Sequence, residues 1–162
     1  MDVLRDAVFI SPSRGPLPFE SVFTDILAFA AQHPEDQYHL MVGTDSQVRD
    51  DATEYVTALI VYRQGKGGRY YFERDRQFKQ RSLRQRIFYE ASRSLSVASQ
   101  LTEYLAEGGH ELDVEIHLDV GNNGATKELI KEVVGMIVGS GFPAKIKPDS
   151  YAASSVADRY TK

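Results

Sequence analysis

Residues 38–47 of the chain are YHLMVGTDSQ, and residues 55–63 are YVTALIVYR. Both contain dense apolar runs of the length of one strand, and the first is typical of a central strand that is buried on both faces. A third run, RYYF at residues 69–72, follows the glycine-rich connection QGKGG, which predicts a hairpin. We therefore expect the strands at residues 38–44, 55–63 and 69–72 to form an antiparallel meander.

The rest of the chain alternates helical and strand patterns. Apolar residues recur at helical spacing over residues 19–32, and Ser82 with Gln85 forms a capping-box pattern at the start of a long helix. The segment LDVEIHLDV at residues 112–120 alternates apolar and polar positions, as a strand with two different faces does. The remaining predicted elements are the end of the long helix near residue 106, helices over residues 125–138 and 150–160, and a short strand over residues 144–147.

This order predicts an α/β fold with a mixed five-stranded sheet, in which three antiparallel strands are followed by parallel crossovers, flanked by helices. Right-handed crossovers place the strand at residues 112–120 parallel to the strand at residues 38–44 and beside it. Residues 1–36, with prolines at positions 12, 16 and 18, are expected to form an irregular arm and a short helix. The arm and helix pack on a single domain of residues 37–162.

Composition narrows the functional classes. The 162 residues are 42% hydrophobic and include no cysteine, which fits one domain and excludes disulfides and thiolate chemistry. No apolar stretch approaches the roughly 20 residues of a membrane span, and the first residues lack a signal-peptide pattern, so we expect a cytoplasmic protein with no membrane partner. The net charge is -4, but residues 66–86 hold eight basic residues against two acidic ones. This basic window fits either a nucleic-acid contact or a solvated surface.

Four acidic residues are predicted to converge. Asp45 and Asp119 follow two neighbouring parallel strands, at the edge where α/β sheets bind ligands. Glu90 lies on the inward stripe of the long helix, where a carboxylate is costly unless it is paired or binds a cation. Asp158 on the last helix supplies a fourth carboxylate. Hard oxygen donors select Mg²⁺ or Mn²⁺, which activate water for phosphodiester hydrolysis.

Simpler interpretations stay open for each acid. Asp45 and Asp119 stand where aspartate commonly forms a turn or caps a helix. Glu90 could pair with Arg86 or Arg93 on its own helix, and the acid near the carboxyl terminus could be solvated. Only the joint placement of the four carboxylates favours a metal site.

His117 is a further candidate, because it shares a strand face with Asp119 two residues away. A histidine there could transfer protons or bind the metal, although a hydrogen-bonded core histidine is the more common case.

Six segments together carry a resemblance to a known family. They are SPSRG at residues 11–15, VGTDSQ at 42–47, GKGGRYY at 65–71, RIFYEASRSL at 86–95, HLDVGNNGATKELI at 117–130 and KPDSYAASSVADRYTK at 147–162. With these segments, most of the chain resembles the ribonuclease H-like superfamily and, more narrowly, the YkuK-type family of bacterial ribonuclease H-like proteins. The resemblance implies a ribonuclease H-like sheet and a metal-binding role for Asp45, Glu90, Asp119 and Asp158.

We therefore predict a metal-dependent phosphodiester-processing protein, a nuclease that acts on nucleic acid through these four carboxylates and His117. The main alternative is a non-catalytic nucleic-acid-binding or assembly module with the same fold. An actin-like kinase or chaperone is a third possibility, but such proteins hold nucleotide between two domains of this kind, and the chain has the length of one.

Overall fold

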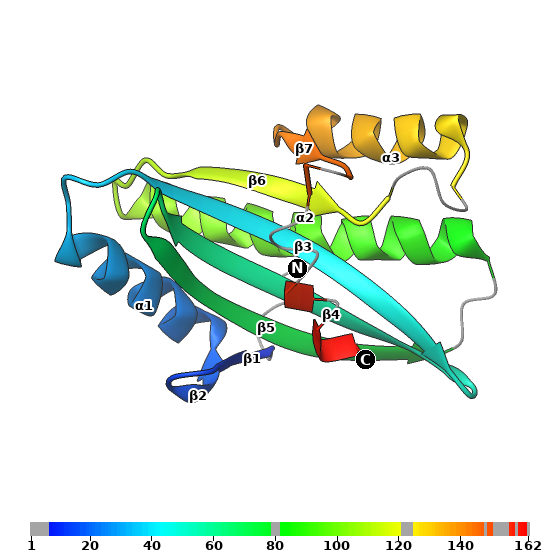
Figure 1. Cartoon of the computed structure of the whole chain (residues 1–162), viewed down its shortest axis with the longest axis horizontal. Coiled ribbons are helices and arrows are strands. Elements are labelled where there is room, and N and C mark those ends of the chain that lie inside the picture. Colours follow the sequence, from blue (N-terminus) through cyan, green and yellow to red (C-terminus); the bar gives the residue numbers. More distant parts are fainter. Residues whose placement is uncertain are drawn as a thin grey trace.

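The computed structural model of the chain describes residues 7–78, 82–120, 125–147, 149–150, 156–157 and 159–161. These residues contain one mixed sheet with the strand order β2-β1-β5-β4-β3-β6-β7 (Figure 1). The strands are β1 (Val8–Ser11), β2 (Gly15–Pro18), β3 (Tyr38–Arg49), β4 (Ala52–Arg63), β5 (Gly67–Phe78), β6 (Asp113–Leu118) and β7 (Ala144–Lys145). The helices are α1 (Phe19–Gln32), α2 (Leu83–Glu107) and α3 (Lys127–Gly139).

The predicted order of strand pairing is confirmed. β3, β4 and β5 form an antiparallel meander, and β6 lies parallel to β3, with Ile116 beside Val42. The three helices begin and end within two residues of the predicted bounds. Ser82 caps α2, since its Oγ accepts a hydrogen bond from the Gln85 backbone N–H at 3.0 Å, and the Gln85 side chain returns the bond. Local pattern alone was sufficient for these elements.

The sheet has seven strands instead of the predicted five, because the amino-terminal arm is not irregular. β1 and β2 form a hairpin that turns at Gly15, whose φ of +76° favours glycine. β1 then joins the sheet through Ile10, which lies beside Phe72 of β5. Pro16 and Pro18 are tolerated because β2 is the outermost strand on its side, where a missing N–H removes no bond to a further strand.

β3, β4 and β5 are each 12 residues long, longer than their apolar runs predict. Their pairing continues through polar residues as far as Arg49, which lies beside Ala52. Asp45 therefore lies inside β3, and the prediction that it leaves the end of the strand is wrong. The ladder between β3 and β6, however, ends where Thr44 lies beside Leu118. Asp45 is thus the first residue of β3 beyond the described pairing with β6.

The two sides of the sheet are covered differently. Apolar residues of α1, α2 and α3 pack into one core with alternate residues of the central strands, such as Val42. The opposite side is covered in part by helical residues 156–157 and 159–161, here called the C-terminal segment, where the ring of Tyr160 stacks on that of Phe72. In Figure 1, α2 passes behind the sheet and the C-terminal segment lies in front of it. No helix among the described residues is both long and apolar enough to cross a lipid bilayer.

A buried carboxylate, Asp25, ties α1 to the sheet. Its Oδ1 lies 2.9 Å from Arg14 Nε, and both of its oxygens lie 3.3 Å from Arg69 Nη1. The Tyr71 hydroxyl also donates to Asp25, and burial followed by this hydrogen bond raises the pKa of Tyr71. Because these partners come from the β1–β2 turn and from β5, one carboxylate joins the hairpin, α1 and the sheet.

We expect Asp25→Asn to lower the free energy of unfolding by about 2 kcal/mol, because two arginines and a buried hydroxyl lose their charged acceptor. Urea denaturation of both proteins measures the change. The matched control is Glu132→Gln, which removes an exposed ion pair with Arg84 and should change stability little. Equal stabilities of all three proteins would contradict the role of Asp25.

Candidate metal centre

Asp45 is positioned by the central strand and by the C-terminal segment. It is buried and lies beside Val56 of β4. The Thr161 hydroxyl of the C-terminal segment donates to Asp45 Oδ2 at 3.0 Å. This contact places the Asp45 carboxylate on the side of the sheet opposite α2, at the point where pairing with β6 has ended. Because β6 no longer flanks β3 there, groups from the two sides of the sheet can approach one another round this edge.

Glu90 belongs to a line of buried polar side chains between β3 and α2, which we call the polar seam: Thr44, Ser46, Glu90 and Ser94. Thr44 Oγ1 lies 2.8 Å from Ser94 Oγ, and the Ser46 hydroxyl donates to Glu90 Oε2 at 2.5 Å. Arg86 supports the seam, since its Nε donates to Ser46 Oγ at 3.2 Å and its Nη2 to the Ser46 carbonyl at 3.3 Å. The seam fixes which face of α2 meets β3.

The two ion pairs considered for Glu90 from the sequence do not form. Arg86 binds Ser46, and Arg93 pairs with Glu73 on β5. Within the described part of the chain, Glu90 has no ion pair, and its one side-chain hydrogen bond comes from Ser46. A buried carboxylate with one hydroxyl donor is poorly stabilised in its charged form.

The electrostatics of Glu90 follow from this surrounding. Burial is the largest cause that raises its pKa, to about 8, and repulsion from Asp45 and Asp119 adds to the increase. The hydrogen bond from Ser46 and the charge of Arg86 act in the opposite direction. Asp45 and Asp119 therefore act electrostatically on Glu90. A cation shared by the three carboxylates would relieve both the burial cost and the repulsion.

Asp119 follows β6 and lies 2.7 Å from Lys147 Nζ. It does not cap α3, because Thr126 does so: Thr126 Oγ1 accepts a hydrogen bond from the Leu129 N–H at 3.1 Å. Of the two simpler roles considered for Asp119, the cap of α3 is thus taken by Thr126.

His117 is 3% exposed, and its Nε2 lies 2.8 Å from Glu115 Oε1. Its Nδ1 is buried and makes no hydrogen bond with the residues that the structure describes. The contact with Glu115 orients the ring on the side of the sheet that Asp45 faces, since His117 lies beside Gly43 in the register. Its role in proton transfer or metal binding stays a prediction.

The donor set fits a hard divalent cation, although the side chains are not drawn together tightly. Asp45, Glu90 and Asp119 supply carboxylate oxygens, which Mg²⁺ and Mn²⁺ prefer. The oxygens of these three residues do not all lie within 4.8 Å of one another. Asp158, the fourth predicted ligand, lies outside the described residues.

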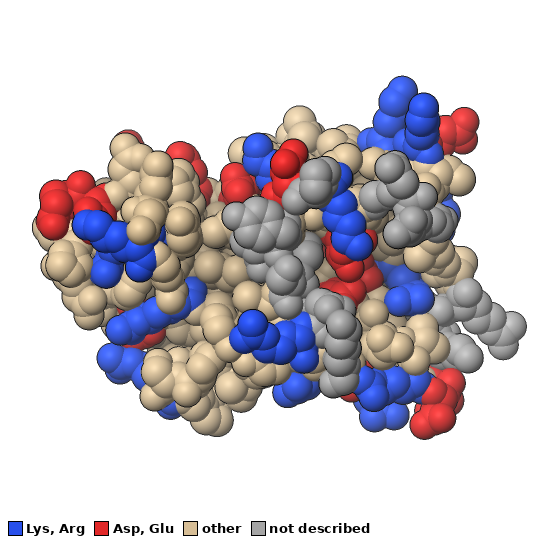
Figure 2. All heavy atoms as spheres, viewed as in Figure 1, with Lys and Arg blue, Asp and Glu red and all other residues tan. Residues whose placement is uncertain are grey.

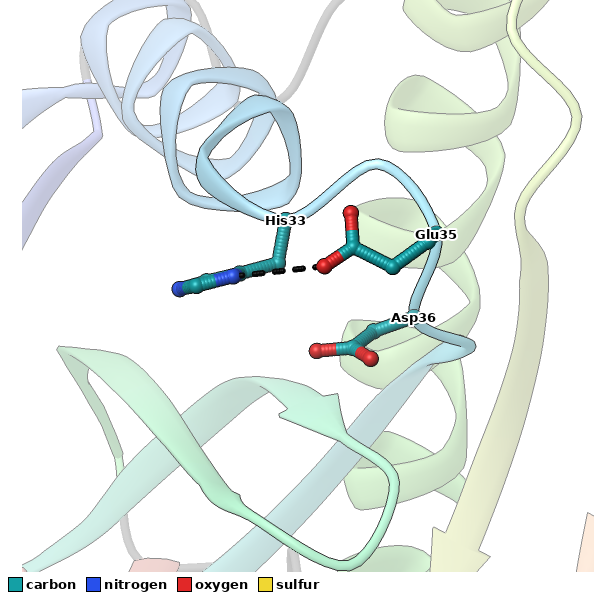
Figure 3. A group of neighbouring side chains, drawn as sticks. All are labelled: His33, Glu35 and Asp36. Carbon is teal, nitrogen blue, oxygen red and sulfur yellow. Dashed lines mark ion pairs between the residues drawn. The ribbon is translucent and has the colours of Figure 1, made fainter.

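One group of possible ligand atoms within 4.8 Å of one another occurs among the described residues, at His33, Glu35 and Asp36 (Figure 3). It lies in the loop between α1 and β3, at the other end of β3 from Arg49. The side chains of His33 and Glu35 are 51% and 68% exposed, and Asp36 already pairs with Lys66 Nζ at 3.1 Å. A cavity of about 580 Å³ also lies at this end of the sheet and contains none of the predicted site residues.

Three contributors to the site were missed from the sequence: Ser46, Thr161 and the bond of Arg86 to Ser46. A signal for the first was present, since Glu90 lies on the inward stripe of α2 and needs a hydrogen-bond donor on the facing strand. No local signal existed for Thr161, because it meets Asp45 across 116 residues of chain.

The pKa of Glu90 generates a prediction about pH dependence. A folded pKa near 8, above the unfolded value of 4.5, means that stability is fully present below pH 4.5 and is lost as the pH rises towards 8. Glu90→Gln keeps an acceptor for Ser46 without the charge, so in chelator at pH 8 it should be more stable than the unchanged protein. One pKa unit corresponds to about 1.4 kcal/mol, and we expect a gain of at least that order.

Thermal melts between pH 5 and 8.5 measure this difference. Glu103→Gln on the exposed face of α2 is the matched control and should follow the unchanged protein at every pH. A Glu90→Gln protein with the same pH profile as the unchanged protein would show that Glu90 is not a strained buried acid.

Known proteins resemble the chain over most of its length. The model of the family described as "Ribonuclease H-like" matches residues 21–162. The chain is 38% identical over 170 residues to the uncharacterized protein YkuK of Bacillus subtilis (strain 168), which covers 96% of this chain and 97% of that protein. Two solved structures are distantly similar to the chain. RNase H1 from the halophilic archaeon Halobacterium salinarum NRC-1 is 15% identical, and the match covers 75% of this chain and 98% of that one, with a TM-score of 0.37. An N-terminal RNase H domain from Mycobacterium tuberculosis is 13% identical, and the match covers 76% of this chain and 96% of that one, with a TM-score of 0.37. By the family match and the relative of nearly equal length, the chain belongs to the ribonuclease H-like family, in its YkuK-type branch.

Proposed function

We propose that the protein is a nuclease that hydrolyses phosphodiester bonds of nucleic acid with the help of Mg²⁺ or Mn²⁺. Asp45 and Asp119 are the primary ligands, Glu90 completes the set from α2, and Asp158 is the fourth ligand. Divalent ions held in this way activate the attacking water and stabilise the leaving oxygen.

The observation that carries the proposal is the state of Glu90. Among the described residues this buried carboxylate has no ion pair, and two further carboxylates repel it, so its negative charge is costly for folding alone. A buried glutamine or a larger apolar residue at this position would be less costly for folding alone. The three acids are best explained by a cation that they bind together.

The protein's own residues have defined tasks in this proposal. Ser46 and Arg86 orient Glu90, Thr161 orients Asp45 and Lys147 faces Asp119. His117, oriented by Glu115, is the candidate for proton transfer on the Asp45 side of the sheet.

A second candidate is a nucleic-acid-binding module without catalysis. It is supported by the separation of the carboxylate oxygens, which do not all lie within 4.8 Å of one another. The two candidates differ in their response to metal, because a module without catalysis gains little from converging acids.

We expect Asp45→Asn to separate them, since it keeps the side chain's shape and its acceptor for Thr161 while removing one charge. In chelator, its melting temperature should equal or slightly exceed that of the unchanged protein, because repulsion among the acids decreases. With excess Mg²⁺ or Mn²⁺ the order should reverse, because metal at 100 times its dissociation constant stabilises the unchanged protein by about 2.7 kcal/mol. Hydrolysis of an oligonucleotide panel should be lost in the variant.

Asp50→Asn is the matched control for this experiment. Asp50 is an exposed acid on the β3–β4 turn with a φ of +51°, a conformation that asparagine also adopts readily. It should melt and respond to metal as the unchanged protein does. If Asp45→Asn lowers stability in chelator and metal affects neither protein, Asp45 is structural and the nuclease proposal fails.

A further inference from the structure

The meander of β3, β4 and β5 continues past the candidate metal centre. β3 extends four residues beyond Asp45 to Arg49, and β4 and β5 pair alongside it down to Phe78, which lies beside Ala52. Laterally paired and alternate residues face the same side of a sheet, so the register assigns one set of side chains to the side that Asp45 faces. The part of this set that reaches from Arg74 to the end of the meander is here called the strand-end face: Gln47, Arg49, Ala52, Glu54, Arg74, Arg76 and Phe78.

Contacts across the meander confirm the assignment. Arg74 Nε lies 3.2 Å from Glu54 Oε1, and the next residue, Asp75, points the other way and accepts a hydrogen bond from Tyr89 of α2 at 2.6 Å. The side of the meander towards α2 is therefore packed, and the strand-end face lies on the opposite side.

The aromatic residue of this face is unusually exposed. Phe78 is 92% exposed, more than the other large exposed apolar side chains, of which Val138 at 56% is the next. Arg76 is exposed as well and makes no ion pair or hydrogen bond with the described part of the chain. A groove of about 260 Å³ runs between these two residues and Asp51. Arg76 and Phe78 occupy alternate positions of β5, so their backbone positions lie about 7 Å apart.

Arg76 is the basic group of this face that can contact an anion. Arg49 and Arg74 donate to the carbonyl oxygens of Thr161 and Tyr160, Arg74 also pairs with Glu54, and Asp51 lines the groove beside Arg76. At the lower right of Figure 2, over the ends of β4 and β5, Lys and Arg side chains lie beside Asp or Glu side chains. The predicted basic window does not form one surface, however. Its Arg69 lies near the other end of β5, about 23 Å from Arg76, and its Lys66 lies just before that end. Lys66 pairs with Asp36 and Arg69 pairs with Asp25.

We propose that the strand-end face is a docking surface for a single-stranded segment of the nucleic acid that the metal centre processes. The inference rests on the proposed function and names its substrate class. A ring as exposed as that of Phe78 can stack on a base that has left its own stack, and Arg76 can contact the adjoining phosphate. A duplex offers no unstacked base to the ring. Because Arg74 lies level with Asp45 in the register and Phe78 lies about 13 Å further along the strand direction, the bound strand continues from the carboxylates towards Phe78.

The sequence offers a direct probe, since the chain contains no tryptophan. Phe78→Trp introduces a single fluorophore at the proposed stacking position, and base stacking quenches its fluorescence. Val138→Trp on α3, away from the strand-end face, is the matched control. Both are titrated with single-stranded DNA, single-stranded RNA and a blunt duplex of the same sequence, in chelator and again with Ca²⁺.

We expect single strands of DNA or RNA, but not the duplex, to quench Phe78→Trp and to leave Val138→Trp unchanged. Phe78→Ala should weaken single-strand binding about tenfold with an unchanged melting temperature. Arg76→Gln should reduce the log-log salt slope by about 0.7, and Arg84→Gln, whose arginine pairs with Glu132, should not.

Absence of quenching, or equal quenching by the duplex, would overturn the proposal, as would equal effects of Arg76→Gln and Arg84→Gln. If single strands quench Phe78→Trp in chelator and Mg²⁺ does not change the melting temperature of the protein, the docking surface is supported and the nuclease proposal is rejected. Metal stabilisation that depends on Asp45, without quenching at position 78, would support the metal centre and reject the docking surface.

Discussion

The burial of Glu90 between α2 and β3 is the constraint on which the site depends. Its carboxylate accepts a hydrogen bond from the Ser46 hydroxyl, and Ser94, one turn further along α2, forms a hydrogen bond with Thr44. Both bonds can form only if α2 has one rotation about its axis and one position along its axis relative to the central strand. β3 in turn cannot shift, because it pairs with β4 along its whole length and with β6 up to Thr44. These two restrictions together fix the position of Glu90 relative to Asp45 and Ser46 on the central strand.

A second set of buried polar contacts holds the amino-terminal half of α2 against β4 and β5. Arg93 pairs with Glu73, and Tyr89 donates to Asp75 while its ring lies 4.4 Å from that of Tyr55. Burial raises the pKa of Glu73, and Arg93 opposes that increase. Charged groups are retained at an interface that apolar residues could fill at lower cost. The consequence is a helix that cannot slide, which keeps Arg86 and Glu90 beside Ser46.

The C-terminal segment completes the environment of Asp45 from the other side of the sheet. Tyr160 stacks on Phe72 and lies 2.6 Å, hydroxyl to hydroxyl, from Tyr70, while Arg49 and Arg74 bind the last carbonyl groups. The same arginines belong to the strand-end face. Docking of the segment therefore uses two of the arginines of the proposed nucleic-acid surface, close to the candidate ligands.

The sequence by itself determined the helices, the pairing order of the central strands and the inward position of Glu90. These follow from the 3.6-residue and two-residue periods and from the capping box, which are local properties of the chain. Only the tertiary structure decided that Pro16 and Pro18 lie in an edge strand, that Asp45 lies within β3, and that Glu90 is bonded to Ser46 instead of an arginine. It also decided that the basic window is divided between two ends of β5. Each of these depends on which distant residue lies opposite, and a strand continues through polar residues wherever a neighbouring strand supplies its hydrogen bonds.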